Sequence, residues 1–470
     1  MRAHFQSVGG SLPLLFGVMV AACGGDGLAP PTGGTFAEVQ ATLVADCAAC
    51  HGEASGRIFR TNMDSAQLIN SGFIDPSDPV QSLLLLKPTG ATAHGGGTIS
   101  TFTPGDQALL ATWIALQPSP TAPVLTAVNI PAGSSAPTID GYFDASWNLA
   151  ASTNFLIGGG WADATSVRMT ALYDPTYLYI RISWTDDARS DRRQPWVKQA
   201  NGTWLSLPAK TPVPAVGSTW TEYMAAAFNA EDRSRFNYED KFAIMWNTYG
   251  ASTVAGFEAQ GCAVTCHDPG SGNAPGTTYN YTDQSLAAKK YTNAPAEIAD
   301  LWHWKLVRNN QHAKMDDQFV RYWVPGPTGA ADGGRASDAG SAGYGSNPAT
   351  AGHPTYRGPT TATPPYYIFD GQKVALTDPE LAALPAGAEI ANMITSGPTL
   401  GRADIDAVAI YNSSTHTWVM EIRRRLVTGE STDVQFDDLT RTYSFGVAVF
   451  DNAQIEHSYM PMPARLVFQP

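Results

Sequence analysis

The 470-residue sequence has few cysteines and few charged residues: five of the former, and 15% of the latter. Basic side chains are outnumbered, with 29 Lys and Arg against 42 Asp and Glu, so the formal net charge is −13. This balance argues against nucleic acid or an anionic lipid surface as a partner and favours docking with basic protein patches. The hydrophobic share of 43% nevertheless indicates a globular chain, long enough for two or three domains.

The first residues predict an export signal. Arg2 precedes an apolar run over residues 11–22 that is too short to span a bilayer permanently. The run ends in VAACG, which resembles a bacterial lipoprotein signal with Cys23 as the lipidated residue; a plain cleaved signal with an incidental Cys23 is the alternative. Gly24 favours sorting to the outer membrane of a Gram-negative bacterium. We therefore expect a signal over 1–22, a flexible tether over 23–35, and an exported, lipid-anchored periplasmic protein.

The other four cysteines form two close pairs, each followed directly by histidine. The first pair is Cys47, Cys50 and His51 in DCAACH, which is the pattern of c-type haem attachment. Two thiols add to the porphyrin vinyl groups, and the adjacent histidine binds the iron. A zinc site would need a second ligand pair nearby, and a thioredoxin-like redox pair would not need His51. The sequence therefore predicts a haem c at this position.

Two helices are predicted around this motif. Thr35 to Glu38 form a capping box that opens an apolar helix running into the cysteines, and Thr103-Pro104 opens a second amphipathic helix. This order resembles the small all-α cytochrome c domain over residues 36–118. The sixth iron ligand is then expected in the intervening loop, where His94 is favoured and Met63 is the alternative.

The pattern changes after a Pro/Ser/Ala-rich stretch, residues 119–137, which predicts a linker. Residues 167–173 and 177–184 alternate strictly and predict a hairpin, and 241–247, 417–424 and 442–450 predict further strands. Many short strands with Pro/Gly turns favour a mainly-β, immunoglobulin-like sandwich over residues 138–470. Residues 325–358 are so rich in glycine and alanine that we expect a flexible insertion. The adjacent pair Asp316 and Asp317 is expected to be surface charge.

Several motifs in this second part occur in a recognisable order: TIDGYFDASWNLA, the tyrosine-rich hairpin, DKFAIMWN, LWHWK, GRADI and FGVAVFDNAQIEHS. Together they resemble the haem-binding domain of the ethylbenzene dehydrogenase gamma subunit and the related dimethylsulfide dehydrogenase subunit. The resemblance implies a β-sandwich that holds one b-type haem and transfers electrons for a molybdenum enzyme. In that family a methionine before the tryptophan-rich strand and a lysine near the C-terminus bind the iron.

This sequence departs from the family pattern at both ligands. GCAVTCH, with Cys262, Cys266 and His267, stands where the methionine would be, and His457 stands where the lysine would be. The resemblance thus implies a second, covalently attached haem with His267 and His457 as axial ligands. His303, in LWHWK, is the alternative distal ligand, with Trp302 and Trp304 expected as pocket walls and Lys305 as a propionate contact. A disulfide between the two cysteines is the alternative to haem.

These expectations describe an electron-transfer protein with two haem c groups rather than an enzyme. Its partners would be redox proteins, either a molybdenum oxidoreductase or another cytochrome. If both irons have two histidine ligands, neither keeps an open position for a substrate. Two alternatives remain: a dihaem peroxidase-like enzyme, which needs one five-coordinate haem, and a ligand- or carbohydrate-binding sandwich, because IDGxxDxxW openings also occur in sugar-binding proteins.

Overall fold

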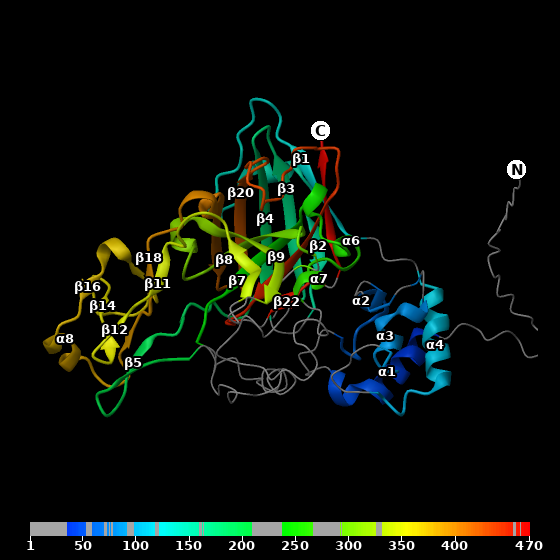
Figure 1. The fold of residues 1–470 in the computed structure, drawn as a ribbon, viewed down its shortest axis with the longest axis horizontal. Helices are drawn as coiled ribbons and strands as arrows, with labels where there is room; N and C mark the ends of the chain where they lie inside the picture. The colour runs from blue at the N-terminus through cyan, green and yellow to red at the C-terminus, as the bar shows by residue number, and fades with distance from the viewer. Residues whose placement is uncertain are drawn as a thin grey trace, which may run out of the picture.

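The computed structural model describes residues 35–52, 59–69, 73–74, 76, 79–91, 98–117, 122–158, 162, 164–208, 237–266, 292, 294–325, 331–454, 457–460 and 462–470. The first helices lie together in one group, and the strands of a large sheet form another (Figure 1). Within the described residues, no helix combines the length and the apolar character that crossing a bilayer requires.

The two predicted N-terminal helices are present. α1 (Phe36–His51) begins at a capping box in which the Thr35 side chain accepts from the Glu38 backbone and the Glu38 carboxylate accepts from the Thr35 N–H at 2.7 Å. α4 (Pro104–Ala115) begins in the same way at Thr103, with Asp106 as its partner. Because each box satisfies N–H groups that a helix start leaves unpaired, the sequence sets both start points.

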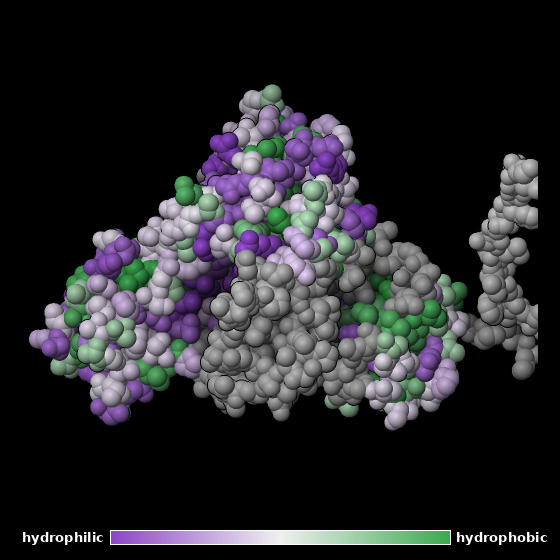
Figure 2. Space-filling view, in the orientation of Figure 1, coloured by the Kyte–Doolittle hydropathy of each residue, from purple (hydrophilic) through white to green (hydrophobic). Residues whose placement is uncertain are grey.

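The helices share a hydrophobic core of their own. Between α1 and α4 lie α2 (Ser65–Ile69), the 3-10 turn η1 (Pro79–Gln81) and α3 (Leu83–Leu86). Their buried side chains form one cluster: Val39, Leu43, Cys47, Phe59, Leu68, Ile74, Leu84, Leu85, Phe102, Leu110, Trp113 and Ile114. Hydrophobic residues also gather on the visible face of this helical group (Figure 2).

The large sheet closes on itself. Ten of its strands pair in the order β1 (Val124–Asn129), β23 (Ala464–Gln469), β21 (Tyr443–Phe450), β7 (Lys241–Asn247), β8 (Ile298–Lys305), β9 (Lys314–Pro325), β19 (Ile405–Asn412), β20 (Thr417–Arg425), β4 (Tyr177–Thr185) and β3 (Ser166–Tyr173). β1 pairs in parallel with both β23 and β3, which joins the two ends of this path. The mainly-β prediction is confirmed, but pairing through β1 makes one closed ring where two separate immunoglobulin-like sheets were expected.

The inside of this ring is the main hydrophobic core. Successive side chains of a strand point to opposite faces, so every second residue of each strand enters the core. On β4 these residues are Leu178, Ile180, Ile182 and Trp184, the face predicted from their alternation. On β8 they include Trp302 and Trp304, both fully buried in the core. The two tryptophans therefore do not line a pocket on the outer face, and that expectation was wrong.

β1 lies within the segment expected to be a linker. Leu125 and Ala127 are fully buried, and Ala127 pairs with Ala171 of β3. Apolar residues alternate in VLTAVN, as in a strand, although proline and serine are frequent around it. This strand pairs with β23 on one side and with β3 on the other, and so closes the ring. The linker prediction over 119–137 was therefore wrong for residues 124–129.

Residues 331–358, expected to be flexible, form paired strands instead. β10 (Ala331–Ser337) pairs with β9, and β11 (Tyr344–Ser346) pairs with β18 (Met393–Thr395). Gly340 and Gly343 have φ values of +118° and +66°, which only glycine adopts readily, and a Cβ on Gly343 would lie 1.7 Å from the Gly397 carbonyl oxygen. The glycines allow tight turns and close backbone approach here, so the expectation of flexibility is corrected.

Smaller elements complete the described chain. The strands are β2 (Thr153–Leu156), β5 (Trp196–Lys198), β6 (Trp204–Ser206), β12 (Ala349–Thr350), β13 (His353–Pro354), β14 (Tyr356–Arg357), β15 (Ile368–Phe369), β16 (Val374–Ala375), β17 (Glu389–Ile390) and β22 (Ser458–Tyr459). The helices are α6 (Phe257–Gln260), α7 (Ala263–Cys266) and α8 (Asp378–Ala383), with 3-10 turns η2 (Ala145–Leu149), η4 (Gly250–Ser252), η6 (Asn310–His312), η7 (Asp370–Gln372) and η8 (Leu400–Ala403).

Candidate functional site

The first candidate site lies at the end of α1. Cys47 is buried in the helical core, and His51 is the last residue of the helix. The His51 Nδ1 lies 2.9 Å from the Phe59 carbonyl oxygen, and the two rings are 5.2 Å apart. A carbonyl oxygen can only accept, so Nδ1 carries the proton and the lone pair of the neutral ring is on Nε2. Metal-binding histidines are commonly oriented by such a hydrogen bond.

Other residues predicted for this site are only partly described. Met63 is half-buried and packs against the helical core. The Cys50 side chain, His94 and Cys23 lie outside the described residues. The choice between His94 and Met63 as the sixth ligand therefore stays a prediction.

The second candidate site lies on the outer face of β7, β8 and β21, opposite the main core. A separate hydrophobic cluster covers this face; its members are Ala243, Met245, Val254, Phe257, Cys262, Val264, Ala299, Leu301, Val320 and Tyr459, with Ala448 and Phe450 packed beside them. We call this surface the outer face. Its residues alternate with the core residues of the same strands, as the pleat requires.

Cys262 is held against the outer face by close backbone approach. It precedes α7 and is only 6% exposed. A Cβ on Gly446 of β21 would lie 3.1 Å from the Cys262 Sγ, so a glycine lets the thiol sit against this strand. The Thr265 N–H bonds to the Cys262 carbonyl at 3.1 Å, so the backbone from Cys262 to Cys266 makes a helical turn. The extra residue of the C-x-x-x-C-H motif is accommodated in this turn.

His303 lies on the same face. It is 4% exposed, and its Nδ1 lies 3.3 Å from the Gln318 Oε1. The Nε2 atom is buried and has no hydrogen-bond partner among the described residues. Burial lowers the pKa of His303 well below its usual value, and Lys305 and Lys241 lower it further, so the ring is neutral near pH 7. A neutral imidazole is the form that binds iron.

A row of rings links His303 to His457. The His303 ring stacks on Phe450 with centroids 5.7 Å apart, and Phe450 lies 4.6 Å from the His457 ring. His457 is in turn 5.9 Å from Tyr459, which belongs to the same cluster as Cys262. The structure thus brings together Cys262 and both histidines that the sequence offered as the distal ligand. His267 and the Cys266 side chain lie outside the described residues.

Two buried lysines lie near this row. The Lys241 ammonium lies 4.0 Å from the centre of the Phe450 ring and donates to the Gln454 carbonyl at 2.8 Å. Lys305, expected as a propionate contact, is buried and paired with Asp316. Asp316 and Asp317 are both fully buried rather than on the surface, because they point to opposite faces of β9 and both faces are covered there. Their assignment as surface charge was wrong.

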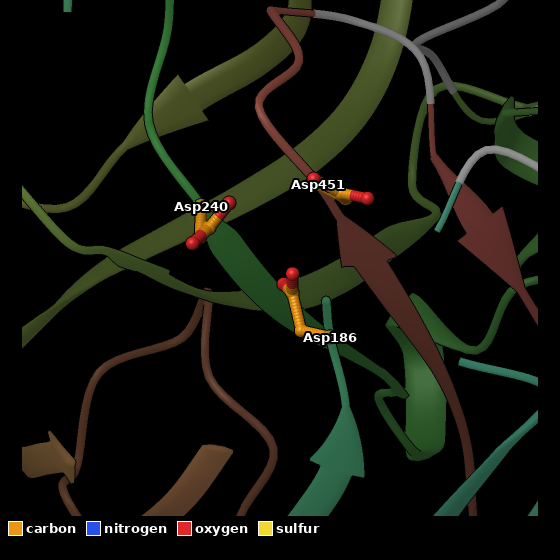
Figure 3. A group of neighbouring side chains, drawn as sticks. All are labelled: Asp186, Asp240 and Asp451. Carbon is orange, nitrogen blue, oxygen red and sulfur yellow. The ribbon is translucent and has the colours of Figure 1, made fainter. Parts of the chain in front are cut away.

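Three carboxylates lie together beyond the strand ends near this row. Asp186, Asp240 and Asp451 follow β4, precede β7 and follow β21 (Figure 3), and one carboxylate oxygen of each lies within 4.8 Å of the others. Asp240 accepts from the Ser190 N–H at 2.7 Å and from the Asn452 N–H at 3.0 Å. Burial raises the pKa of Asp240 well above its usual value, and its two acidic neighbours raise it further. These bonds connect the residue before β7 to the segments that follow β4 and β21.

Among the described residues, the outer face carries side chains of the kinds that hold a haem. A thiol, a buried neutral histidine with an unpartnered Nε2, and a second histidine share one apolar face with an aromatic ring between the histidines. Sequence reasoning missed Gly446 and Phe450. Both lie in FGVAVFDNAQIEHS, where the alternation of β21 could have placed Gly446, Ala448 and Phe450 on one face.

A search among curated proteins found no match. Among solved structures, a family 9 carbohydrate-binding module from Caldicellulosiruptor kristjanssonii in complex with glucose matches at 8% identity, covering 74% of this chain and 95% of that one, with a TM-score of 0.25. The same kind of module in complex with cellotriose matches at 7% identity, covering 74% and 93%, also with a TM-score of 0.25. TM-scores this low do not establish a shared fold.

A protein-family model matches a long, continuous part of the chain. The model described as ethylbenzene dehydrogenase matches residues 125–460, from the second residue of β1 to the end of the segment that carries His457 and Tyr459. This match spans most of the chain, including the whole outer face. The chain therefore belongs to the ethylbenzene dehydrogenase family.

Proposed function

We propose that this protein is a dihaem c-type cytochrome that transfers electrons one at a time. One haem is attached at Cys47 and Cys50 with His51 as axial ligand and His94 or Met63 opposite. The other is attached at Cys262 and Cys266 with His267 as axial ligand. When bound, each haem supplies a one-electron redox centre. Lipid anchoring through Cys23 and docking with a redox partner, such as a molybdenum oxidoreductase or another cytochrome, belong to the same proposal.

The observation that carries this proposal is the shared location of Cys262, His303 and His457. They come from three segments far apart in the sequence, yet all three contact one set of outer-face residues. A disulfide between the two cysteines would need neither histidine. Membership of a family named for a dehydrogenase supports an electron-transfer role over ligand binding alone.

The protein's own groups would bind and orient the haem. The Phe59 carbonyl oxygen accepts from His51 Nδ1, which fixes the tautomer and leaves the lone pair of Nε2 to bind iron. On the outer face, burial keeps His303 neutral and the packed apolar residues exclude water. His457 is the proposed distal ligand of the second haem, and His303 is its alternative. With a protein ligand on both sides of each iron, no position would remain for peroxide.

The test is a set of alanine variants of the two histidines in the full chain, produced with a haem-attachment system. Whichever of His303 and His457 is the distal ligand, its alanine variant should convert the second haem from low-spin to high-spin, which is half of the haem in the chain. The change would be visible in the absorption and electron paramagnetic resonance spectra of the oxidised protein. His416→Ala is the matched control, because His416 is exposed and its Nδ1 bonds the Asp187 carbonyl at 2.9 Å.

Three results would contradict the proposal. If neither histidine variant changes the spin state, the outer face does not ligate iron. If the parent protein already contains a high-spin haem that binds cyanide readily, the peroxidase-like alternative is favoured. If Cys262→Ser and Cys266→Ser together leave the haem content unchanged, the second haem is not attached there.

A further inference from the structure

A second group of buried carboxylates lies inside the ring, away from the outer face. Asp300 of β8 and Asp317 of β9 point into the interior beside Trp302, and Asp433 comes from the loop between β20 and β21. Ligand oxygens of these three aspartates all lie within 4.8 Å of one another. Asp433 also belongs to an adjoining group with Asp338 and Glu430. We call Asp300, Asp317 and Asp433 the interior triad.

In Asp300 and Asp433, only one of the two carboxylate oxygens accepts hydrogen bonds from the protein. Asp300 Oδ2 accepts from the Val434 N–H at 2.9 Å and from Trp302 Nε1 at 3.1 Å, and Asp433 Oδ2 accepts from Thr428 Oγ1 at 2.5 Å. The other oxygen, Oδ1, of both aspartates is buried without a hydrogen-bond partner. The donors therefore orient the carboxylates and leave the remaining oxygens directed to something else.

Asp317 lacks hydrogen-bond partners at both of its carboxylate oxygens. Its side chain is completely buried. Asp338, only 6% exposed, accepts from Thr432 Oγ1 at 2.6 Å through Oδ1, whereas its Oδ2 has no partner. Buried polar atoms in folded proteins almost always have a partner, so several such carboxylate oxygens in one place indicate a site for an ion or water.

The charge of this region is also unbalanced. Within the described chain, Arg424 is the cation that forms ion pairs with the triad, at 2.7 Å to Asp433, 3.5 Å to Asp300 and 3.6 Å to Asp317. Its contacts are to the Oδ2 atoms, whereas the Oδ1 atoms of all three aspartates have no hydrogen-bond partner among the described residues. One guanidinium faces three fully buried carboxylates of the triad, with Asp338 and Glu430 beside them.

We propose that the interior triad binds one Ca²⁺ ion through the carboxylate oxygens that lack hydrogen-bond partners. Calcium takes six to eight oxygen ligands at about 2.3–2.6 Å, so ligands on opposite sides of one ion lie roughly 5 Å apart, which matches the spacing of the triad. The ion neutralises the buried charge and joins β8, β9 and the loop before β21. This role is independent of the proposed haems.

The competing account is that the carboxylates hold protons instead of a metal ion. The two accounts differ in what Asp317→Asn does. If Asp317 is a calcium ligand, the substitution removes a charged ligand and abolishes the response to calcium. If Asp317 is protonated, asparagine is a close substitute and calcium affects neither protein.

The experiment uses the full chain, stripped with a chelator that is then removed. Calcium binding is measured by equilibrium dialysis with elemental analysis, and thermal unfolding is followed with and without CaCl₂. We expect one ion per chain and an unfolding temperature that rises with calcium concentration, as ligand binding to the folded state requires. Asp317→Asn should weaken binding by roughly tenfold or more and remove this rise.

Two controls locate the ion. Asp437→Asn changes an exposed aspartate of the same type and should leave calcium binding unchanged. Asp240→Asn tests the other acidic group, shown in Figure 3, and should also retain the response. The proposal is overturned if the parent chain binds no calcium, or if the response survives Asp317→Asn. It is also overturned if Asp240→Asn alone abolishes the response. Should Asp317→Asn not fold, Asp300→Asn, at another residue of the triad, with the same readout takes its place.

Discussion

Glu239 offers a stability test with an internal control. Its carboxylate is fully buried and accepts from the Val307 N–H and from Arg308 Nε, both at 2.6 Å, while Arg193 Nε forms an ion pair at 3.0 Å. These bonds join the segment before β7 to the turn after β8. The substitution Glu239→Gln keeps the shape but places an amide N–H₂ against donors and leaves buried guanidinium groups without their counter-charge.

The expected loss follows from burial. Removing one partner of a buried ion pair costs about 3–5 kcal/mol, because the remaining charge is left without compensation. The matched control is Asp370→Asn, since Asp370 accepts from Lys373 Nζ at 2.6 Å but its side chain is 49% exposed and that of Lys373 is 35% exposed. An exposed pair of this kind contributes about 0–1 kcal/mol. The unfolding temperature should fall on the order of 10 °C for Glu239→Gln and by a few degrees at most for the control.

The pH dependence supplies a second readout. Burial alone would raise the pKa of Glu239, but Arg308 and Arg193 outweigh it and hold the pKa below its usual value of 4.5. A carboxyl group with a lowered pKa in the folded state stabilises the protein above its unfolded pKa, and this contribution is lost as the pH falls. The difference between native protein and Glu239→Gln, measured by circular dichroism during denaturant unfolding, should therefore shrink below about pH 4.5. Equal losses for the two variants, or a difference that does not change with pH, would refute the reasoning.

Two further predictions concern the outer face and the closure of the ring. Gly446→Val should displace Cys262 and reduce haem attachment at the second motif. Gly345→Val is the control and should leave attachment unchanged, because a Cβ there meets nothing within 4 Å. The measurement is the haem content per chain, and equal haem in both variants would contradict the role of Gly446. Leu125→Ala should cost about 2–5 kcal/mol, because its side chain is fully buried where β1 closes the ring. Val124→Ala, at a 41% exposed neighbour, should cost less than about 0.5 kcal/mol, and similar losses at both positions would show that β1 does not close the ring.

Local signals in the sequence predicted the local structure well. The capping boxes at Thr35 and Thr103 mark the starts of α1 and α4, and strict alternation marks the β3–β4 hairpin. Composition was a poorer guide, since it suggested a linker at β1 and flexibility at β10 and β11. Both segments are ordered by strand partners distant in the sequence, which composition does not encode.

The candidate sites could be predicted only in part. The cysteine–histidine motifs are visible in the sequence, but the closeness of Cys262, His303 and His457 depends on how β7, β8 and β21 pair. Arg424 lies in a run of three arginines, typical of a solvated surface. Its spacing from Trp418, Met420 and Ile422 could have placed it inside the ring, since all four alternate along β20.

The central claim is that each of the two motifs carries covalently bound haem. Mass spectrometry of the mature protein, intact and after proteolysis, tests it most directly. We expect two haem adducts per chain, one on a peptide with Cys47 and Cys50 and the other on a peptide with Cys262 and Cys266. A single adduct, or a disulfide on the second peptide, would contradict it.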